Sequence, residues 1–419
     1  MERISAKYYI ETPYAVEVAA AVLAGEQSSG TFVAVPGETE ALKERFAARV
    51  ESVEYLETVS QPAIPGAFSS SNKYHRANIE VSWSVENFGY NLPTLVSTLQ
   101  GNLYEITQFT GLKLMDITIP ESYAIHFKGP SFGIDGCRKL TGTPDNRPLI
   151  GTIIKPSIGL SPAQTATIVK ELAAAGIDFI KDDELMSSTA NSPFSERVDA
   201  VMRVINDHAD KTGKKVMYAF NISDETDEMS RKYEKVVTSG GTAVMISLNS
   251  VGLSASKKIC DLGNLAIHGH RNGWGMLNRH PLLGIDFQAY QKLWRLAGVD
   301  QLHVNGIDNK FWESDDSVVN SIEACLKPLL GGYCVLPVVS SGQWGGQAFE
   351  TYRRTRTTDL LYMAGGGIMA HPDGPRGGVI ALQQAWEGAV NGLSLEEAAA
   401  QYPEFQKSVI KFGKTVATN

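Results

Sequence analysis

The sequence predicts a parallel (β/α)₈ barrel over residues 146–419, ending in a helical tail and preceded by a smaller α+β domain of ferredoxin-like type over residues 1–140. After residue 145, eight short apolar runs recur at about 30-residue spacing with helix-period segments between them. The length of 419 residues and the 43% hydrophobic content allow a large core and two or three domains. An open doubly wound sheet is the alternative, but it usually has a glycine fingerprint after its first strand, where this chain has Lys155-Pro156.

The N-terminal region mixes helices and strands without a repeating unit, which favours a small α+β domain. We expect helices at about 13–25, 38–49 and 92–101 and strands at 31–35, 53–59, 76–84, 112–119 and 122–127. The turn-rich segment Thr141–Arg147 is expected to link this domain to the barrel.

The barrel strands are predicted from the eight apolar runs themselves. They are Gly151–Ile154, Ile177–Ile180, Val216–Ala219, Ala243–Leu248, Leu265–Ile267, Gln301–Val304, Cys334–Val339 and Leu360–Met363. Helices are expected between them, for example at Pro162–Ala175, where a serine cap precedes a proline in the first turn.

Composition excludes several classes of function. The net charge of -8 argues against a nucleic-acid binder, which normally has a basic face. We find no apolar run of about 18 residues, so we expect no membrane-spanning helix. The four cysteines have no C-x-x-C spacing and are expected to be reduced core residues of a cytoplasmic protein.

Charged residues follow the first two barrel strands, at the end where barrel enzymes carry their chemistry. Lys155 follows the first strand, and Lys181-Asp182-Asp183-Glu184 follows the second. Strand alternation places Lys181 and Asp183 on one side and Asp182 on the other. Carboxylates at adjacent positions suit Mg²⁺, and carbamylation by CO₂ would turn the lysine from a repelling cation into an oxygen ligand. The alternatives are a strand-end lysine at 155 and an acidic surface loop with an internal ion pair.

Histidines follow the fifth and sixth strands. The fifth strand ends in His268-Gly269-His270-Arg271, the sixth ends in His303, and the next loop contains Lys310. Two histidines on one side of a strand, followed by an arginine, indicate a site that handles protons and an anion. Five of the eight histidines fall near predicted strand ends or loops, at 268, 270, 280, 303 and 371.

Glycine-rich turns follow the seventh and eighth strands, at Ser340–Gln343 and Ala364–Gly367. Successive backbone N–H groups in such turns can bind a phosphate, and barrels often place a phosphate site there. Together the strand ends predict an enzyme that binds a phosphorylated carbonyl compound between Mg²⁺ and an anion site and stabilises an enediolate.

Several of these motifs resemble the large subunit of RuBisCO. They are Gly-Thr-Ile-Ile-Lys-Pro (151–156) with Gly-Leu (159–160), Phe-Ile-Lys-Asp-Asp-Glu (179–184), His-Gly-His-Arg (268–271), Asp-Gln-Leu-His (300–303), Pro-Val-Val-Ser-Ser-Gly (337–342) and Gly-Gly-Gly (365–367). In the N-terminal part, Gly25-Glu26 through Gly30-Thr31 and Gly101-Asn102 are also similar, so the resemblance spans nearly the whole chain.

The resemblance implies a role for each matching residue. Lys181 would be the carbamylated lysine, and Asp183 and Glu184 the other Mg²⁺ ligands. Lys155 would be an acid/base, His268 and His270 would stand near the metal and the enediolate, and Lys310 would be the mobile-loop lysine. One end of the substrate would be bound by Arg271, His303 and Ser340, and a phosphate at the other end by Gly342, Gly365 and Gly366. Glu26, Thr31 and Asn102 would reach the active site of a neighbouring subunit, which makes a homodimer the minimum unit, with higher oligomers of dimers open.

The departures from RuBisCO decide the predicted function. Ser157 replaces a lysine, Phe32 a tryptophan, Gln301 a histidine and Ser341 a glycine, and the segment 306–309 lacks the glycine-lysine hinge. The chain therefore looks like a RuBisCO-like protein (form IV) that does not fix CO₂.

The retained lysines favour one reaction class among RuBisCO-like proteins. A cation at Lys310 has a role if a phosphorylated 3-keto sugar acid loses its carboxyl group, as a decarboxylase or a transcarboxylase/hydrolase acting on 3-oxo-isoapionate 4-phosphate would require. The first alternative is an isomerase or enolase acting on methylthio-ribulose or diketo phosphates in methionine salvage. The second is a non-catalytic sugar-phosphate binder, which the retained lysine–carboxylate set argues against.

Overall fold

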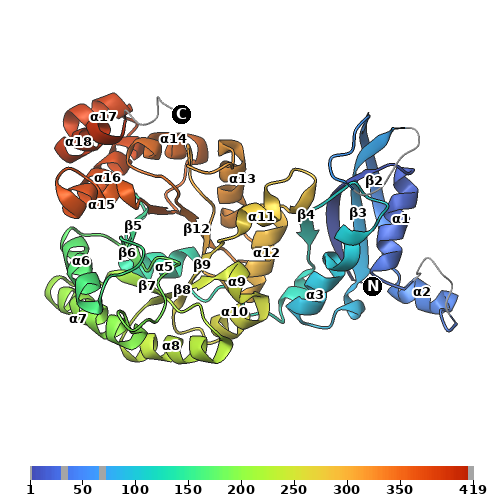
Figure 1. Ribbon diagram of the computed structural model, residues 1–419, viewed down its shortest axis with the longest axis horizontal. Helices are drawn as coiled ribbons and strands as arrows, with labels where there is room; N and C mark the ends of the chain where they lie inside the picture. The colour runs from blue at the N-terminus through green and yellow to red at the C-terminus, as the bar shows by residue number, and fades with distance from the viewer. Residues whose placement is uncertain (1, 30–35, 66–71, 414–419) are drawn as a thin grey trace. The chain divides into compact units, whose positions relative to one another are not determined.

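The computed structural model describes residues 2–29, 36–65 and 72–413. The chain forms two compact units (Figure 1). The first comprises Met1–Lys128 and Gly273–Ala297, and the second comprises Gly129–Asn272 and Gly298–Asn419. This division differs from the expected boundary near residues 140–146 because helix α5 (Gly133–Thr141) packs on the barrel core through Cys137.

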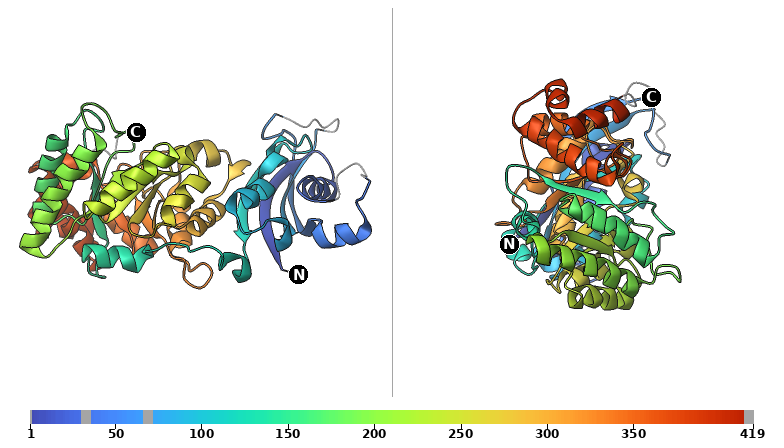
Figure 2. Two further views of the ribbon diagram at one scale, coloured as in Figure 1. Left: turned by 90° about the horizontal axis from the view of Figure 1, so that it is seen from below. Right: turned by 90° about the vertical axis from the view of Figure 1, so that its left-hand side faces the viewer.

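The first unit is built on a five-stranded sheet of order β10-β4-β1-β3-β2. The β1–β3, β1–β4 and β2–β3 pairs are antiparallel, and β10 runs parallel to β4. Figure 2 shows α1 nearly end-on beside the strands. The elements of this unit are β1 (Arg3–Thr12), α1 (Val16–Glu26), α2 (Glu40–Phe46), β2 (Arg49–Val59), β3 (Tyr74–Ser84), η1 (Val85–Asn87), α3 (Leu92–Leu99), η2 (Gly101–Glu105), β4 (Gly111–Thr118), α4 (Glu121–Ala124), α11 (Trp274–Asn278), β10 (Leu283–Ile285) and α12 (Phe287–Ala297).

Strand β1 lies in the middle of this sheet, although we made no prediction for its residues. Ile4, Ala6, Tyr8 and Ile10 alternate along it and are fully buried. This alternation is the pattern that identifies a half-buried strand, so the signal was present in the sequence.

One predicted strand of this unit is wrong and another cannot be assessed. The segment 122–127 forms helix α4 instead, in which the Pro120 carbonyl accepts the Ala124 N–H (3.2 Å). The rings of Tyr123 and Phe127 pack 5.3 Å apart. An extended segment would place residues four apart at a separation of about 13 Å, too far for this contact. The strand expected at 31–35 lies outside the described residues. The helices expected near 13–25, 38–49 and 92–101 are confirmed as α1, α2 and α3.

The second unit is a closed barrel of eight parallel strands, which excludes the open sheet. Each of the eight predicted runs overlaps one of its strands. The strands are β5 (Leu149–Ile153), β6 (Phe179–Lys181), β7 (Met217–Asn221), β8 (Ala243–Ser247), β9 (Ala266–His270), β11 (Gln301–His303), β12 (Leu336–Val339) and β13 (Leu361–Met363). The helices after α5 are α6 (Pro162–Ala174), α7 (Phe194–Thr212), α8 (Thr226–Thr238), α9 (Leu248–Val251), α10 (Leu253–Cys260), α13 (Asp315–Leu326), α14 (Gly346–Thr355), α15 (Gly366–Met369), α16 (Gly374–Val390), α17 (Leu395–Gln401) and α18 (Pro403–Phe412).

Apolar side chains from the strands fill the inside of the barrel. Phe179, Met217, Met245 and Leu361 belong to this buried cluster. Because side chains alternate along a strand, Lys181 points to the same side as Phe179, into the barrel. The core therefore places a lysine at the top of an apolar interior.

The remaining sequence-level expectations concern membranes and cysteines. Within residues 2–29, 36–65 and 72–413, no helix is long and apolar enough to cross a membrane. All four cysteines are free thiols, and three of them are buried.

Candidate active site

Lys181, the last residue of β6, is buried at the barrel mouth, with 1% of its side chain exposed. Its ammonium nitrogen donates to the Asp182 carbonyl (2.9 Å) and Glu184 Oε2 (3.3 Å) and lies 3.4 Å from Met245 Sδ. Burial lowers the pKa of Lys181, although the carboxylates of Glu184 and Asp183 oppose this shift. A buried lysine with a lowered pKa presents the neutral amine that adds CO₂.

Two carboxylates and a second lysine lie beside Lys181. Asp183 Oδ2 accepts from the Lys155 ammonium (2.6 Å), which also donates to Ser157 Oγ (2.7 Å). Lys155 is 43% exposed and Glu184 is 33% exposed, so both can meet a ligand from solvent. The structure thus brings Lys155, Lys181, Asp183 and Glu184 together.

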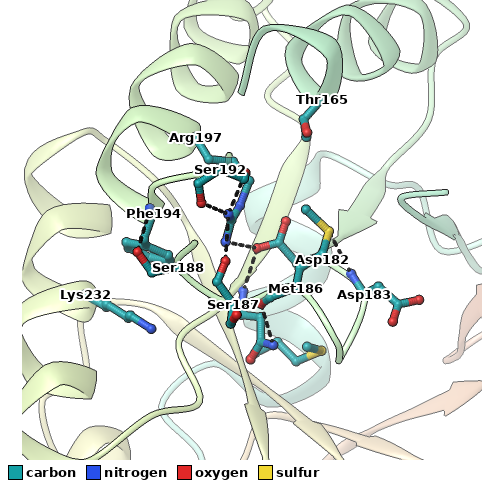
Figure 3. Close-up of polar contacts among 12 residues, drawn as sticks. Thr165, Asp182, Asp183, Met186, Ser187, Ser188, Ser192, Phe194, Arg197 and Lys232 are labelled. Atoms are coloured by element: carbon teal, nitrogen blue, oxygen red, sulfur yellow. Dashed lines mark hydrogen bonds and ion pairs between the residues drawn. The ribbon is translucent and has the colours of Figure 1, made fainter. Parts of the chain in front are cut away.

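Asp182 points away from this group, as strand alternation predicts (Figure 3). Its carboxylate accepts from Tyr218 Oη (2.5 Å), Asn221 N (2.9 Å) and Arg197 Nη2 (3.4 Å). Both Asp182 and Arg197 are fully buried. Asp182 is therefore a structural residue beneath the loop that carries Asp183 and Glu184.

The loop after β6 is held in place by two side chains that lie beneath it. Arg197 Nη1 donates to the Ser187 and Ser192 carbonyls (3.2 and 3.1 Å), and Figure 3 shows its guanidinium between these serines and Asp182. Asn221 Nδ2, at the end of β7, donates to the carbonyls of Glu184 and Met186 (3.2 and 3.0 Å). These bonds fix the path of the backbone from Glu184 to Ser192.

The buried histidines form one hydrogen-bonded chain. His268 Nδ1 lies 2.8 Å from Gln301 Oε1, and His268 Nε2 lies 2.8 Å from His303 Nε2. Gln301 Nε2 faces Cys137 Sγ and Met217 Sδ (both 3.2 Å), so its carbonyl oxygen faces His268. His268 Nδ1 must then carry the proton.

The tautomer of His303 follows from that of His268. Burial lowers the pKa of both histidines well below the usual value, so both rings are neutral. Neutral His268 accepts at Nε2, so His303 donates from Nε2 and accepts at Nδ1, which lies 3.1 Å from Ser340 Oγ. The order of donation is therefore Ser340 to His303 to His268 to Gln301.

His270 connects the histidine chain to the carboxylates. Its Nε2 lies 3.7 Å from Glu184 Oε2, and its ring centroid lies 4.4 Å from that of His303. Burial and the Lys181 charge lower the pKa of His270 to about 4. His270 is thus a neutral imidazole at neutral pH, able to accept or donate one hydrogen bond.

Arg271, the residue after β9, forms a buried ion pair with Glu313 (2.7 Å). Ser340 lies close by, because it contacts His303 in the neighbouring strand β11. The structure therefore brings Arg271, His303 and Ser340 to one side of the barrel mouth.

The two glycine-rich loops lie side by side. A Cβ on Gly367 would lie 2.6 Å from the Gln343 carbonyl oxygen, so the loop after β13 touches the loop after β12. Gly342 has a left-handed φ of +76°, and a Cβ on it would lie 3.5 Å from Lys310 N and Cβ. Lys310 therefore lies beside the glycine-rich loops, with its ammonium 5.2 Å from the centre of the Phe311 ring.

Several predicted residues lie in the first unit or outside this group. Glu26 ends α1, Asn102 lies in η2, and both are exposed. Their neighbours Gln27 and Gly101 touch, since a Cβ on Gly101 would lie 2.3 Å from Gln27 Nε2, so Glu26 and Asn102 flank one corner of the unit. Thr31 lies outside the described residues.

Two further histidines do not join the barrel-mouth group. His280 belongs to the first unit, and its Nδ1 accepts the Leu282 N–H (3.1 Å). His371 is buried beside the Glu404 carbonyl (3.0 Å). Their position near predicted strand ends was therefore not a sign of chemistry.

Four polar residues of the site were not predicted from the sequence. Arg197, Asn221, Asn305 and Glu313 all bond to predicted site residues or to their loops. Asn221 ends a barrel strand, so the strand-end rule could have identified it. Glu313 was not recognised as a site residue because it stands just before Asp315 and Asp316, which are typical of the acidic first turn of a helix.

The donor set is consistent with a divalent ion only if Lys181 is modified. In the described part of the chain, no three histidine, cysteine, aspartate or glutamate side chains cluster as metal ligands. Two carboxylates, Asp183 and Glu184, flank the buried Lys181 amine, and a carbamate there would supply the third hard oxygen ligand. The residues present therefore fit Mg²⁺ together with a lysine carbamate.

A closed (β/α)₈ barrel whose strand ends bring together lysines, carboxylates and neutral histidines defines a barrel enzyme. The sequence matches the ribulose bisphosphate carboxylase large chain catalytic domain over residues 134–412 and the N-terminal domain of the same chain over residues 2–123. The chain belongs to the RuBisCO large-chain family, as a RuBisCO-like protein.

Its relatives include proteins with a named substrate. The chain is 52% identical to a 3-oxo-isoapionate-4-phosphate transcarboxylase/hydrolase of Xanthobacter autotrophicus, over 97% of this chain and 99% of that protein. It is 48% identical to a 3-oxo-isoapionate-4-phosphate decarboxylase of Rhizobium etli, over 98% of each.

Solved structures of similar proteins have the same fold. A rubisco-like protein from Burkholderia fungorum has a TM-score of 0.92 and 43% identity, covering 98% of this chain and 100% of that one. The octameric RuBisCO of Pyrococcus horikoshii has a TM-score of 0.87 and 32% identity, covering 99% and 94%. The predicted fold class, barrel and N-terminal sheet domain, is confirmed.

Proposed function

We propose that the protein acts on 3-oxo-isoapionate 4-phosphate or a closely similar phosphorylated 3-keto sugar acid and breaks the bond to its carboxyl group. Both named relatives act on this substrate, one as a transcarboxylase/hydrolase and one as a decarboxylase. The observation that carries the proposal is the group formed by Lys155, Lys181, Asp183 and Glu184 at the barrel mouth. CO₂ fixation is not part of the proposal.

The cofactors of this proposal are Mg²⁺ and CO₂, the latter as a carbamate on Lys181. Carbamylated Lys181, Asp183 and Glu184 would hold the ion. When bound, it supplies positive charge that polarises a keto oxygen and stabilises the negative charge left when the carboxyl group departs. Burial supports the modification because it lowers the pKa of Lys181, which favours the neutral amine that reacts with CO₂.

The other residues of the site would bind the substrate and move protons. Lys155 lies beside Asp183, and His270 lies beside Glu184. Both side chains would therefore be placed to transfer a proton at the reacting carbon. Lys310 would stabilise the carboxyl group as it leaves. His268 is fully buried and its ring nitrogens bond to Gln301 and His303, so we assign it a positioning role through His303.

The proposed roles at the two ends of the substrate follow the geometry. Gly342, Gly365 and Gly366 would bind the phosphate near Lys310, and Arg271, His303 and Ser340 would bind the opposite end. Glu26, Thr31 and Asn102 would complete the site of a second copy, in a homodimer or an oligomer of dimers. An octameric relative supports assembly, and a cytoplasmic location stays a prediction.

A product assay tests the proposal. The protein, with Mg²⁺ and bicarbonate, is incubated with ¹³C-labelled 3-oxo-isoapionate 4-phosphate, and released CO₂ and the sugar-phosphate products are followed by NMR. Because 3-keto acids lose CO₂ slowly by themselves, the rate is compared with that of Lys181→Met and of the exposed control Lys170→Met. We expect turnover in the wild type and in Lys170→Met, with only the background rate in Lys181→Met.

The products distinguish the two reactions and the alternatives. CO₂ with a single decarboxylated product identifies a decarboxylase, and carboxyl transfer followed by C–C cleavage identifies a transcarboxylase/hydrolase. Only background rates with this substrate, together with proton exchange on a methylthio-ribulose phosphate, would contradict the proposal in favour of an isomerase. Sugar-phosphate binding without any turnover would indicate a non-catalytic binder.

A further inference from the structure

The ion pair between Arg271 and Glu313 lies at the end of the site to which we assigned the unphosphorylated part of the substrate. Its atoms are 2.7 Å apart, and the two side chains are only 4% and 2% exposed. A surface arginine would be available to a phosphate, whereas this guanidinium already has a carboxylate on it. The pair therefore changes which ligand this end can accept.

Glu313 is held by donors from three parts of the barrel. Its Oε2 accepts from Arg271 Nη2 and from Asn305 Nδ2 (2.5 Å), and its Oε1 accepts from Ser317 Oγ (2.9 Å). Asn305 is itself oriented by Ser341, whose Oγ donates to Asn305 Oδ1 (2.9 Å). A carboxylate with this many fixed donors is a built part of the site and is costly to displace.

His303 and Ser340 add no positive charge beside Arg271. Burial lowers the pKa of His303 well below its usual value, so its ring is neutral, and Ser340 is uncharged. Among Arg271, His303 and Ser340, the guanidinium is the only cation, and Glu313 balances it. A phosphate dianion placed here would meet a fixed negative charge with no surplus positive charge from these three residues.

The opposite end of the site has a different balance of charge. Lys310 lies beside the left-handed Gly342, and a Cβ on Gly366 in the next glycine-rich loop would meet no atom within 4 Å. Backbone N–H groups and an ammonium are suitable partners for a phosphate.

We propose that Glu313 is a specificity residue that makes the site select sugar monophosphates. The phosphate lies at the Lys310 and glycine end, and an uncharged hydroxyl or keto end lies against Arg271. This inference rests on the proposed function for the placement of the substrate. It adds that a bisphosphate is rejected by a carboxylate of the protein, through Glu313 and its support from Asn305, Ser317 and Ser341.

Calorimetric binding of two probes tests the inference without any turnover. Ribulose 5-phosphate and ribulose 1,5-bisphosphate are titrated into the protein with Mg²⁺ and bicarbonate, and the ratio of their Kd values is recorded. For the wild type we expect the bisphosphate to bind no more tightly than the monophosphate. In Glu313→Gln, which keeps the shape but removes the charge, we expect the ratio to shift towards the bisphosphate by about 10-fold or more.

A matched control removes a charge elsewhere on the same segment. Asp316 lies in the first turn of α13 with an 85% exposed side chain, and Asp316→Asn should leave the ratio at the wild-type value. An equal shift in Asp316→Asn would show that general electrostatics, not Glu313, sets the preference. An unchanged ratio in folded Glu313→Gln would overturn the inference.

The wild-type titration keeps the test decisive even if Glu313→Gln does not fold. A wild type that binds the bisphosphate about 10-fold more tightly than the monophosphate contradicts the inference directly, as does one that binds neither probe. The proposed reaction and this inference can fail separately. If the protein does not turn over 3-oxo-isoapionate 4-phosphate, the proposed reaction is contradicted, but the ratio of the two Kd values can still depend on Glu313.

Discussion

The two sides of the barrel mouth differ in how exposed their polar side chains are and in how fully these side chains are paired. On the β5–β6 side, Lys155 and Glu184 are partly exposed, and the Lys181 amine has one short hydrogen bond, to the Asp182 carbonyl (2.9 Å), and a longer contact with Glu184 (3.3 Å). On the β9–β11 side, His268 and Gln301 are fully buried, and each of their ring or amide groups has a partner inside the protein. The first side is arranged to exchange partners with a ligand, and the second is arranged to stay fixed.

This difference predicts which substitutions should lower turnover and which should lower the free energy of unfolding. Substitutions of the partly exposed Lys155 and Glu184 on the β5–β6 side should remove chemistry and leave folding nearly intact, because solvent can replace the lost contacts. Substitutions among the buried polar groups should lower the free energy of unfolding, because their partners are left unpaired in the interior.

The largest expected effect is on turnover, in Glu184→Gln. The amide cannot ligate Mg²⁺ as the carboxylate does, so we expect turnover to fall by about 10⁴-fold, equal to about 5.5 kcal/mol of activation free energy. Its melting temperature should stay close to that of the wild type. Glu196→Gln, on the exposed face of α7, is the control and should retain full turnover. Equal turnover in the two variants would contradict the role of Glu184.

The next effect is on stability, in Arg197→Met. Removing the guanidinium leaves the buried Asp182 carboxylate without its cation, which should lower the unfolding free energy of the barrel by about 3–5 kcal/mol. Urea unfolding followed by circular dichroism measures the change. Arg203→Met, exposed on the same helix, should change it by less than about 0.5 kcal/mol. A stable Arg197→Met protein would mean that the pair does not hold the loop.

A smaller loss is expected in Gln301→Leu. His268 Nδ1–H would lose its acceptor in the interior, which costs about 1–3 kcal/mol of unfolding free energy. The ring nitrogens of His268 and His303 would also lose their fixed tautomers, which ¹⁵N NMR shifts report. Gln406→Leu, at an exposed position of α18, should change neither quantity. An unchanged tautomer in Gln301→Leu would refute the proposed order of donation.

The last expected effect is a pH dependence of stability from the buried histidines. The folded pKa values of His268 and His303 are depressed below the unfolded value of about 6.5. Below pH 6.5 the unfolded chain binds protons that the folded chain does not, so acidification favours unfolding. Each histidine should lower the unfolding free energy by about 1.4 kcal/mol per pH unit, from pH 6.5 down to its folded pKa.

Histidine-detected NMR checks the same point directly. The ring signals of His268 and His303 should not titrate near pH 6.5, and the exposed His126 serves as an internal comparison of signal behaviour. Titration of His303 near pH 6.5 would show that the buried chain is open to solvent.

The sequence was sufficient for the barrel because its signals are local. Each strand is a short apolar run between helices, and each of the eight predicted runs overlaps a strand. The position of Lys181 and Asp183 on one side and Asp182 on the other also followed from strand alternation alone. Helix α4 was mistaken for a strand because a segment of four to six apolar and polar residues fits either structure.

Long-range pairing could not be read in the same way. The partner of Arg271 is 42 positions away, in a loop whose acidic residues look like an ordinary helix start. The segment 273–297 lies between two barrel strands in sequence but adds β10 to the sheet of the first unit. Neither fact follows from periodicity, because each depends on how distant segments pack.

The central claim is that Lys181 becomes a carbamate that completes the ligand set of Asp183 and Glu184. The most direct measurement is ¹³C NMR of the protein equilibrated with ¹³C-bicarbonate and Mg²⁺. We expect a carbamate signal in the wild type and in Lys170→Met that disappears in Lys181→Met and weakens when Mg²⁺ is chelated. A wild-type spectrum without this signal, or one that persists in Lys181→Met, would contradict the account.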